Sequence, residues 1–303
     1  MKNFSYKKFM LIFGINFLIV FLLFILIYLK PPKPLKFSED NLLAAVLIPH
    51  PPLMLEEVGG LYSLFIKKTV ISVEKALKEI VQAKPDTIII ITPHSKIRNN
   101  CFSIYAENDL YGDFTKYNVP KNVKVQAQSD VGFIKKLIER LTETSLKLSS
   151  LNPGTKLDHG VTVPLYFLNK AGFEGKIVVI NHSEQGIQEH LELGRLIRKV
   201  IDSYKDKKFV FIASGSLSHN LKPFAPNEYI PETIEFDKTI IKAFKEGNYN
   251  LITGIDRELE EITLQCGYKP IIIGLGIINK TPLNNQVLSY EAPVGVGYLV
   301  AEF

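Results

Sequence analysis

The chain has 303 residues, 46% of them hydrophobic, and a formal net charge of +5. This apolar content is typical of globular proteins and excludes a disordered chain, and the length suits one large domain or two small ones. The 36 basic and 31 acidic residues are interspersed, without the basic stripe of a nucleic-acid-binding protein. Two cysteines and no CxxC pair argue against a disulfide framework and a zinc ribbon.

The first expected element is a membrane-spanning helix. Residues 9–29 are apolar apart from Gly14 and Asn16, and an α-helix needs about 20 such residues to cross a bilayer. No small-residue cleavage site follows, so the pattern predicts an uncleaved, single-pass membrane anchor over residues 1–30. Lysines lie on both sides of the run, and the short basic N-terminus slightly favours a main domain outside the cytoplasm. Residues 31–41, rich in Pro and Lys, are expected to form an extended linker.

From residue 42 onward, short β-branched runs alternate with helical patterns. Strands are expected over residues 44–48, 87–91, 102–107, 123–128, 176–181, 209–213 and 298–301. Helices are expected over residues 66–82, 130–142, 164–170, 185–204, 234–246, 248–252 and 257–264, and residues 270–275 fit either element. The alternation predicts an α/β fold, with one domain over residues 42–303 and a mainly parallel central sheet flanked by helices.

Four of the six histidines lie at expected strand ends or in polar loops. His50, His94 and His219 each follow an expected strand, and His159 opens a new segment. An α/β sheet gathers its catalytic groups at such strand ends. Four imidazoles in these positions indicate a metal site or acid–base chemistry. The competing interpretation of each is structural, as a turn residue, a helix cap or part of a surface loop.

Two other histidines and one polar segment carry weaker signals. His182 follows an expected strand and is a candidate pocket residue. His190 lies inside an expected helix and is expected to be solvated. Residues 111–114 lie in a long polar excursion, which fits either a loop that covers a pocket or an ordinary surface turn.

Five sequence frames occur in order between residue 42 and the C-terminus. They are Ile-Pro-His50-Pro-Pro-Leu, Ile-Thr-Pro-His94-Ser, Leu-Asp-His159-Gly-Val, Ala-Ser-Gly-Ser-Leu-Ser-His219 and Ser-Tyr-Glu291-Ala-Pro-Val-Gly-Val-Gly-Tyr. Together they resemble the class III extradiol ring-cleavage dioxygenases, in particular the catalytic domain of the protocatechuate 4,5-dioxygenase type. The Memo-like proteins look like relatives on the same fold.

The resemblance implies a ferrous site of two histidines and a carboxylate. His50 and His94 match the two histidine ligands, His219 matches an acid–base histidine near the metal, and His159 matches a histidine that lines the substrate pocket. The implied activity is cleavage of a catechol-like aromatic ring with non-haem Fe(II) and O₂. Some relatives pair with a small helical subunit, and a homodimer is a further expectation, because homodimers are common among soluble oligomers.

The third metal ligand is where the chain departs from the family pattern. Many relatives carry Glu immediately before a Cys-Gly pair, and this position is Gln265 here, whereas Memo-like members present the cysteine, which is Cys266. Glu261 lies four residues before Gln265, so on a helix it would share that face. We therefore expect His50, His94 and Cys266 as ligands, with Gln265 or Glu261 as alternatives to the cysteine.

The ligand set leaves two further functions open. A thiolate is a soft ligand that suits zinc or copper(I) better than oxygen chemistry, so zinc is the alternative to Fe(II). One alternative is a Memo-like metal- or ligand-binding domain without oxygenase activity. The other is a zinc-dependent hydrolytic enzyme on the same ligands.

Overall fold

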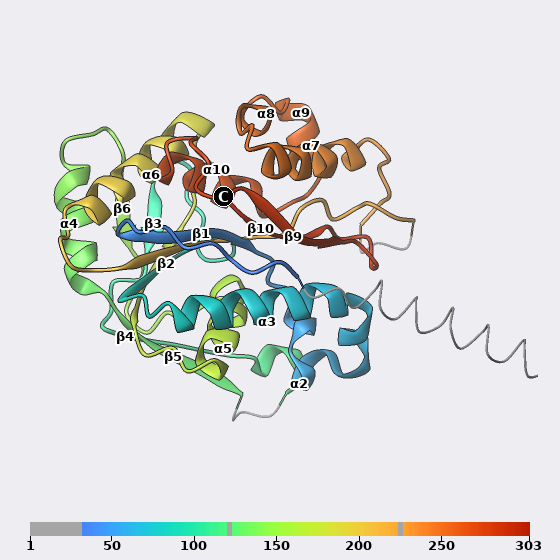
Figure 1. Cartoon of the computed structure of the whole chain (residues 1–303), viewed down its shortest axis with the longest axis horizontal. Helices are drawn as coiled ribbons and strands as arrows, with labels where there is room; N and C mark the ends of the chain where they lie inside the picture. Colours follow the sequence, from blue (N-terminus) through green and yellow to red (C-terminus); the bar gives the residue numbers. More distant parts are fainter. Residues whose placement is uncertain (1–31, 120–122, 224–226) are drawn as a thin grey trace, which may run out of the picture. The chain divides into compact units, whose positions relative to one another are not determined.

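A large mixed sheet organises the part of the chain that the computed structural model describes, which is residues 32–119, 123–223 and 227–303. Its strands are β1 (Leu42–Ile48), β2 (Thr87–Thr92), β3 (Phe102–Ile104), β4 (Asp109–Asp113), β5 (Lys124–Ser129), β6 (Leu148–Ser150), β7 (Lys176–Asn181), β8 (Phe209–Ser214), β9 (Gln286–Glu291) and β10 (Tyr298–Glu302). They are arranged in the order β4-β5-β7-β2-β8-β1-β10-β9, and β3 pairs with β6 and β7 (Figure 1).

The strands in the middle of the sheet, from β5 through β7, β2 and β8 to β1, run parallel. Antiparallel strands complete both edges, with β4 beside β5 on one side and the β10–β9 pair beside β1 on the other. The sheet is therefore mixed, although its centre has the parallel order expected from the sequence. Strands β9 and β10 are consecutive and have no helix between them. A short connection of this kind lets neighbouring strands pair antiparallel, whereas parallel neighbours need a longer crossover.

The longer helices are α3 (Lys67–Gln82), α4 (Val131–Leu141), α5 (His159–Lys170), α6 (Ile187–Asp202), α7 (Thr233–Glu246) and α10 (Tyr268–Ile277). The shorter ones are α2 (Glu56–Gly59), α8 (Asn250–Thr253) and α9 (Arg257–Ile262), with 3₁₀ turns at Pro52–Met54, Gly60–Ile66 and Thr115–Tyr117. Aspartates that precede three of the helices accept a hydrogen bond from a backbone N–H of the first turn, which stabilises the helix start. These caps are Asp130 for α4, Asp158 for α5 and Asp256 for α9.

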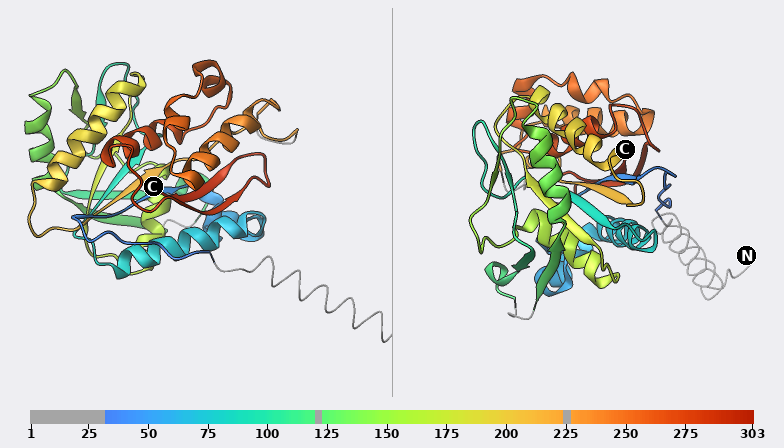
Figure 2. Two further views of the ribbon diagram at one scale, coloured as in Figure 1. Left: turned by 45° about the horizontal axis from the view of Figure 1, so that its top comes forward. Right: turned by 90° about the vertical axis from the view of Figure 1, so that its left-hand side faces the viewer.

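The helices cover both faces of the sheet. Ile88 and Ile90 of β2 belong to the apolar cluster that includes buried side chains of α3 and α5, whereas Ile89 and Ile91 belong to the cluster that includes α4, α6, α7 and α10. Successive strand residues point to opposite faces, so an unbroken apolar strand requires cover on both sides. Figures 1 and 2 show α3 and α5 on one face and α6, α7 and α10 on the other.

The structure corrects the expected membrane helix. Within the described residues, no helix has both the length and the apolar content that a membrane crossing requires. The long helices α3 and α6 have 16 residues each, fewer than the roughly 20 that span a bilayer. The anchor predicted over residues 1–30, with its apolar run 9–29, lies outside the described residues. The described residues therefore give no support to the expected transmembrane helix or to the membrane localisation.

The structure also corrects two local expectations and decides a third point that the sequence left open. Residues 111–113 belong to strand β4, which pairs with β5, and do not form a loop over a pocket. Residues 270–275, which fitted either element, lie in helix α10. His190 was expected to be solvated but is completely buried. Its Nδ1 contacts the carbonyl oxygen of Gly186 at 2.7 Å, and its ring packs edge-on against Phe102.

Candidate metal centre and its cleft

Three of the expected histidines meet at the ends of neighbouring elements. His50 follows β1, His94 follows β2, and His159 begins α5. The Nε2 atoms of His50 and His94 lie 2.8 Å apart. One ligand nitrogen from each of the three rings lies within 4.8 Å of the others. This is a group of three imidazoles from which a metal ion could take its ligands.

The ring of His50 is fixed by a relay of hydrogen bonds. Its Nδ1 lies 2.8 Å from Ser214 Oγ, and that hydroxyl donates its own hydrogen to the carbonyl oxygen of Gly160. This carbonyl is available because the residue four positions later in α5 is Pro164, which has no N–H to donate to it. Since the Ser214 hydrogen is used, Oγ accepts from Nδ1–H of His50. The lone pair of His50 therefore lies on Nε2, the nitrogen that faces His94 and could bind a metal ion.

Asp158 fixes the start of α5 against the sheet. Its Oδ1 accepts hydrogen bonds from Gly160 N at 2.8 Å and from Thr92 Oγ1 at 2.6 Å, and its Oδ2 accepts one from Tyr105 OH at 3.3 Å. A side chain at Gly160 would collide with Thr92 Oγ1, so this close approach needs glycine. His159 is thereby held beside the end of β2.

The imidazoles at this site are neutral near pH 7. Burial, with the neighbouring His94 and His159 as further causes, lowers the pKa of His50 well below its ordinary value. Burial lowers the pKa of His94 to about 3 and the pKa of His159 to about 4. Burial also lowers the pKa of His219. Neutral imidazole is the form that binds a metal ion, so the set is chemically suited to one.

Cys266 approaches the histidines from the loop before α10. Its Sγ lies 3.6 Å from His50 Nε2 and accepts a hydrogen bond from Ser216 N at 3.3 Å. The loops after β8 and before α10 touch through two glycines, since a Cβ on Gly215 would collide with the Cα of Gly267. Burial raises the pKa of the Cys266 thiol to about 11, so binding a metal ion would release its proton.

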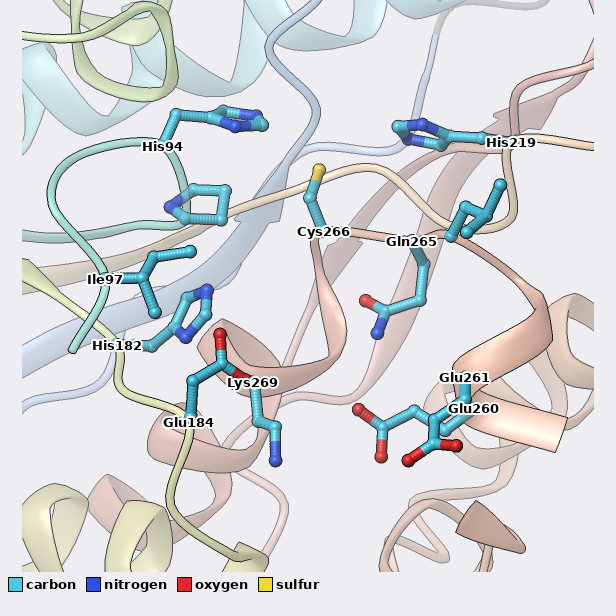
Figure 3. A pocket seen from close by; sticks show the side chains of 12 residues that line it. His94, Ile97, His182, Glu184, His219, Glu260, Glu261, Gln265, Cys266 and Lys269 are labelled. Atoms are coloured by element: carbon cyan, nitrogen blue, oxygen red, sulfur yellow. The ribbon is translucent and has the colours of Figure 1, made fainter. Parts of the chain in front are cut away.

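The two alternatives to Cys266 are engaged elsewhere. Gln265 Oε1 accepts a hydrogen bond from Tyr268 N at 2.6 Å and thereby serves the N-terminus of α10. The Glu261 carboxylate pairs with the exposed Arg257 at 2.7 Å. In Figure 3 the Gln265 amide points away from the imidazoles, whereas Cys266 points toward them. Of the three expected candidates for the third ligand, Cys266 is therefore the one whose side chain lies beside His50, although the group of ligand atoms within 4.8 Å of one another contains His159 in its place.

His159 lies beside His50 and His94, but the orientation of its ring suits hydrogen-bond donation better than metal binding. Its ring stacks on His94 with centroids 4.0 Å apart and an angle of 18° between the planes. Imidazole lone pairs lie in the ring plane, so two nearly parallel rings direct their nitrogens side by side and not to one point. Lys116 Nζ, which can only donate, lies 3.5 Å from His159 Nδ1 and leaves the ring hydrogen on Nε2. His159 therefore presents a donor rather than a lone pair at Nε2.

A cleft of about 480 Å³ opens beside Cys266 and His94, a volume typical of small-molecule sites. It is lined by Pro93, His94, Ile97, His182, Glu184, His219, Glu260, Glu261, Leu264, Gln265, Cys266 and Lys269. His219 lies across from His94 in Figure 3. Among the described residues, its buried Nε2 has no hydrogen-bond partner. His182 also lines the cleft, in agreement with its position after β7. His50 and His159 do not line it.

The loop that carries His219 is held by a residue that the sequence did not reveal. Asp237 of α7 accepts hydrogen bonds at Oδ1 from Ser218 N at 3.0 Å and Ser218 Oγ at 2.6 Å, and at Oδ2 from Tyr290 OH at 2.7 Å. Burial raises the pKa of Asp237 to about 6. No sequence motif surrounds Asp237. Tyr290 lies in the frame around Glu291, which drew attention as part of the family resemblance, so the contact between Asp237 and Tyr290 became visible only in the fold.

Comparison with known proteins places the chain in a family. Residues 44–301 match the family described as the catalytic LigB subunit of aromatic ring-opening dioxygenase. The match covers most of the chain, and the chain belongs to this family. It supports an extradiol-type dioxygenase or a Memo-like protein as the general class.

The similar proteins include one named as an extradiol dioxygenase and one named as a MEMO1 family protein. The chain is 33% identical over 260 residues to protein CA_C1420 of Clostridium acetobutylicum. The matched region covers 83% of this chain and 55% of that protein, so the chain spans about half the length of this relative. It is 25% identical over 236 residues to a 4,5-DOPA dioxygenase extradiol of Mirabilis jalapa, covering 75% of this chain and 86% of the relative. It is also 25% identical over 237 residues to a MEMO1 family protein of Saccharolobus solfataricus, covering 73% of each chain.

A solved structure shares the fold. The crystal structure of the uncharacterized protein JW3007 from Escherichia coli K12 superposes with a TM-score of 0.54 and 17% sequence identity, covering 86% of this chain and 98% of that one. At this identity the likeness concerns the fold alone.

Proposed function

We propose that the protein is an extradiol-type dioxygenase that cleaves a catechol-like aromatic ring with non-haem Fe(II) and O₂. The observation that carries the proposal is the pair of neutral imidazoles, His50 and His94, whose Nε2 atoms face each other 2.8 Å apart beside the cleft. Membership of the LigB family supports the reaction class, and so does the relative named as a 4,5-DOPA dioxygenase.

His50, His94 and Cys266 would hold the iron. When bound, the ion supplies a centre at which an aromatic diol and O₂ come together, because three protein ligands leave coordination positions open. The relay through Ser214 keeps the His50 Nε2 lone pair directed to the ion. Burial keeps the imidazoles neutral, so protons do not compete for these nitrogens near pH 7.

The other two histidines would act on the substrate. His219 Nε2 is buried, has no partner among the described residues and belongs to a neutral imidazole that lines the cleft. It is the group to accept the proton that a ring hydroxyl gives up. His159 does not line the cleft and its Nδ1 faces Lys116, so its Nε2–H would donate a hydrogen bond only to a substrate oxygen that reaches the imidazole pair.

The test starts with metal content. The full chain is purified anaerobically without chelator, and iron, zinc and copper per chain are counted by elemental analysis, with the His50→Ala/His94→Ala double variant as control. The iron-loaded protein is then given a panel of catechols and O₂ consumption is followed. We expect about one iron per chain, its loss in the double variant, and O₂ uptake with at least one catechol. Bound iron without turnover of any catechol would contradict the proposal.

One observation favours a second candidate, a Memo-like metal-binding protein without oxygenase activity. The position where relatives carry a carboxylate holds Gln265, its Oε1 is bound to Tyr268 N, and the residue near His50 is a thiol. A soft thiolate suits zinc or copper(I). Zinc or copper that is retained on purification, is lost with Cys266→Ala and supports no O₂ uptake would select this candidate. Zinc with O₂-independent turnover would instead indicate a hydrolytic enzyme.

A further inference from the structure

The cleft has two chemically different ends. Cys266, His94 and His219 lie at one end, where the proposed ring chemistry takes place. The other end carries the acidic and basic side chains Glu184, Glu260, Glu261 and Lys269, with Gln265 between the two groups in Figure 3. A substrate whose ring lies at the imidazole end would extend its substituent toward these charges. The charged end is therefore placed to select among substituted rings.

The charges at this end are not equally available to a ligand. Glu261 is paired with Arg257 on the exposed side of α9. Lys269 Nζ donates a hydrogen bond to the carbonyl oxygen of Gln185 at 3.1 Å. Within the described part of the chain, the side-chain carboxylate of Glu260 accepts no hydrogen bond and forms no ion pair. It is nevertheless half-buried in the cleft wall.

A half-buried carboxylate without a hydrogen bond or an ion pair is unfavourable, because it has lost part of its water and gained no direct contact in return. Burial raises the pKa of Glu260, and the nearby Lys269 opposes this rise without cancelling it. Taken together, three carboxylates and the two cations Lys269 and Arg257 leave one negative charge in excess around this end. Lys269, the cation that lines the cleft, donates to Gln185 O and forms no ion pair with Glu260, so among the described residues this carboxylate is left without a cation in contact with it.

We infer that Glu260 is a specificity-determining residue that binds a cationic amine on the substituent of the aromatic substrate. This inference rests on the proposed function, since it takes the ring to lie at the imidazole end of the cleft. An ammonium group would give Glu260 its missing partner and offset the excess negative charge. A carboxylate-bearing ring would be disfavoured, because its anion would face Glu184 and Glu260.

The experiment compares two catechols that differ in one group. Dopamine carries an aminoethyl arm, and 4-ethylcatechol carries an ethyl arm without the amine. 3,4-Dihydroxyphenylacetate supplies a negative arm. Binding of each to the anaerobic, metal-loaded full chain is measured by titration calorimetry, and O₂ uptake is then measured separately. We expect dopamine to bind roughly two- to fivefold more tightly than 4-ethylcatechol, as a partly exposed ion pair permits, and the acid to bind most weakly.

Variants assign the preference to one carboxylate. Glu260→Gln removes the charge and is expected to abolish the preference for dopamine while changing 4-ethylcatechol binding less than twofold. Glu258→Gln removes the same charge from the same helix at an exposed position that does not line the cleft, and should leave the preference intact. Glu260→Asp keeps the charge and should retain part of it.

The outcomes separate this inference from the proposed function. If dopamine binds in a Glu260-dependent way but no O₂ is consumed, the amine site stands and the dioxygenase proposal fails. If 4-ethylcatechol is cleaved but dopamine has no advantage, or Glu260→Gln leaves its advantage unchanged, the dioxygenase proposal stands and the amine site is overturned. If dopamine does not bind at all, the amine site is overturned whatever the O₂ measurement gives.

Discussion

His50 Nδ1 lies 2.8 Å from Ser214 Oγ, and this contact determines which nitrogen of His50 carries the hydrogen. Because the hydroxyl donates to Gly160 O, it can only accept from Nδ1–H. Ser214→Ala removes the acceptor that fixes the tautomer. We expect the affinity for the metal ion to fall about 10- to 100-fold, as is typical when such an outer partner is lost. The measurement is metal affinity by competition with a chelator of known strength.

Ser216→Ala is the matched control for this prediction. It also removes a buried hydroxyl from the segment after β8, but Ser216 contacts the site through its backbone N–H, which the variant keeps. Its metal affinity should stay within about twofold of the unchanged protein. Equal affinities for Ser214→Ala and the parent chain would mean that the relay does not orient His50.

The second prediction separates Cys266 from His159 as the third ligand. Cys266→Ala should lose most of the bound metal, whereas His159→Gln should retain it, because the His159 ring is stacked on His94 and presents a donor. Cys101→Ala controls for loss of a thiol and should behave as the parent chain. Elemental analysis of the purified variants checks the prediction. Retention of metal by Cys266→Ala together with its loss from His159→Gln would reverse the assignment.

The third prediction concerns the contact between the loops after β8 and before α10. A Cβ at Gly215 would collide with the backbone of Gly267, so Gly215→Ala must push the two loops apart. Since overpacking typically costs about 1–3 kcal/mol, we expect a loss of that size in the free energy of unfolding, together with weaker metal binding through Cys266. Urea unfolding and metal titration check both effects. Gly132→Ala in α4, where a Cβ meets no atom closer than 3.4 Å, should not destabilise the protein.

The fourth prediction is a pH dependence that arises from Asp237. Burial raises its pKa to about 6 in the folded protein, whereas an unfolded aspartate titrates near pH ~4. Between these values the folded state binds more protons, so the free energy of unfolding contributed by this group falls as the pH rises from about 4 to 6 and stays low above. Asp237→Asn has no such titration. Its Oδ1 can still accept from Ser218, and Tyr290 OH can turn to accept from the amide.

We therefore expect Asp237→Asn to gain stability relative to the parent chain as the pH rises, by on the order of 1–3 kcal/mol between pH ~4 and pH ~7. Urea unfolding at several pH values measures the difference between the two proteins. Asp130→Asn is a useful contrast, because hydrogen bonds from Thr87 and Phe133, together with Lys207, lower the pKa of Asp130 despite its burial, and the variant should lose stability at neutral pH. A difference for Asp237→Asn that does not change with pH would contradict the assignment.

Much of the fold was predictable because it depends on local patterns. The short β-branched run over residues 87–91, bounded by Pro85 and Pro93, predicted a strand covered on both faces, and it lies in β2. Residues 270–275 could not be assigned, because an apolar helix buried on all sides and a buried strand share the same composition. Strand β9 escaped prediction because its burial is partial and irregular. His190 was misjudged because periodicity does not show that a polar group can satisfy a buried carbonyl.

The candidate site was also predictable only in part. The histidines at strand ends were recognisable, since parallel strands deliver their carboxyl ends to one edge of the sheet, and His50 and His94 do lie in contact. The spacing of residues in the sequence could not show in which direction each side chain points. Gln265 and Cys266 are neighbours in the chain, yet one side chain binds the backbone of α10 and the other faces His50. The distant partners Ser214 and Asp237 depend on packing between segments, which no local pattern encodes.

His50 and Cys266 are 216 positions apart in the chain, and their side chains lie 3.6 Å from each other. A metal ion held by both would act as a reversible cross-link between the first strand and the last helix. No proteolytic fragment that lacks either end could then retain the ion, and its release should coincide with global unfolding. An ion at 100 times its dissociation constant would add about 2.7 kcal/mol to the folded state. The supply of metal would thereby affect the stability of the folded chain.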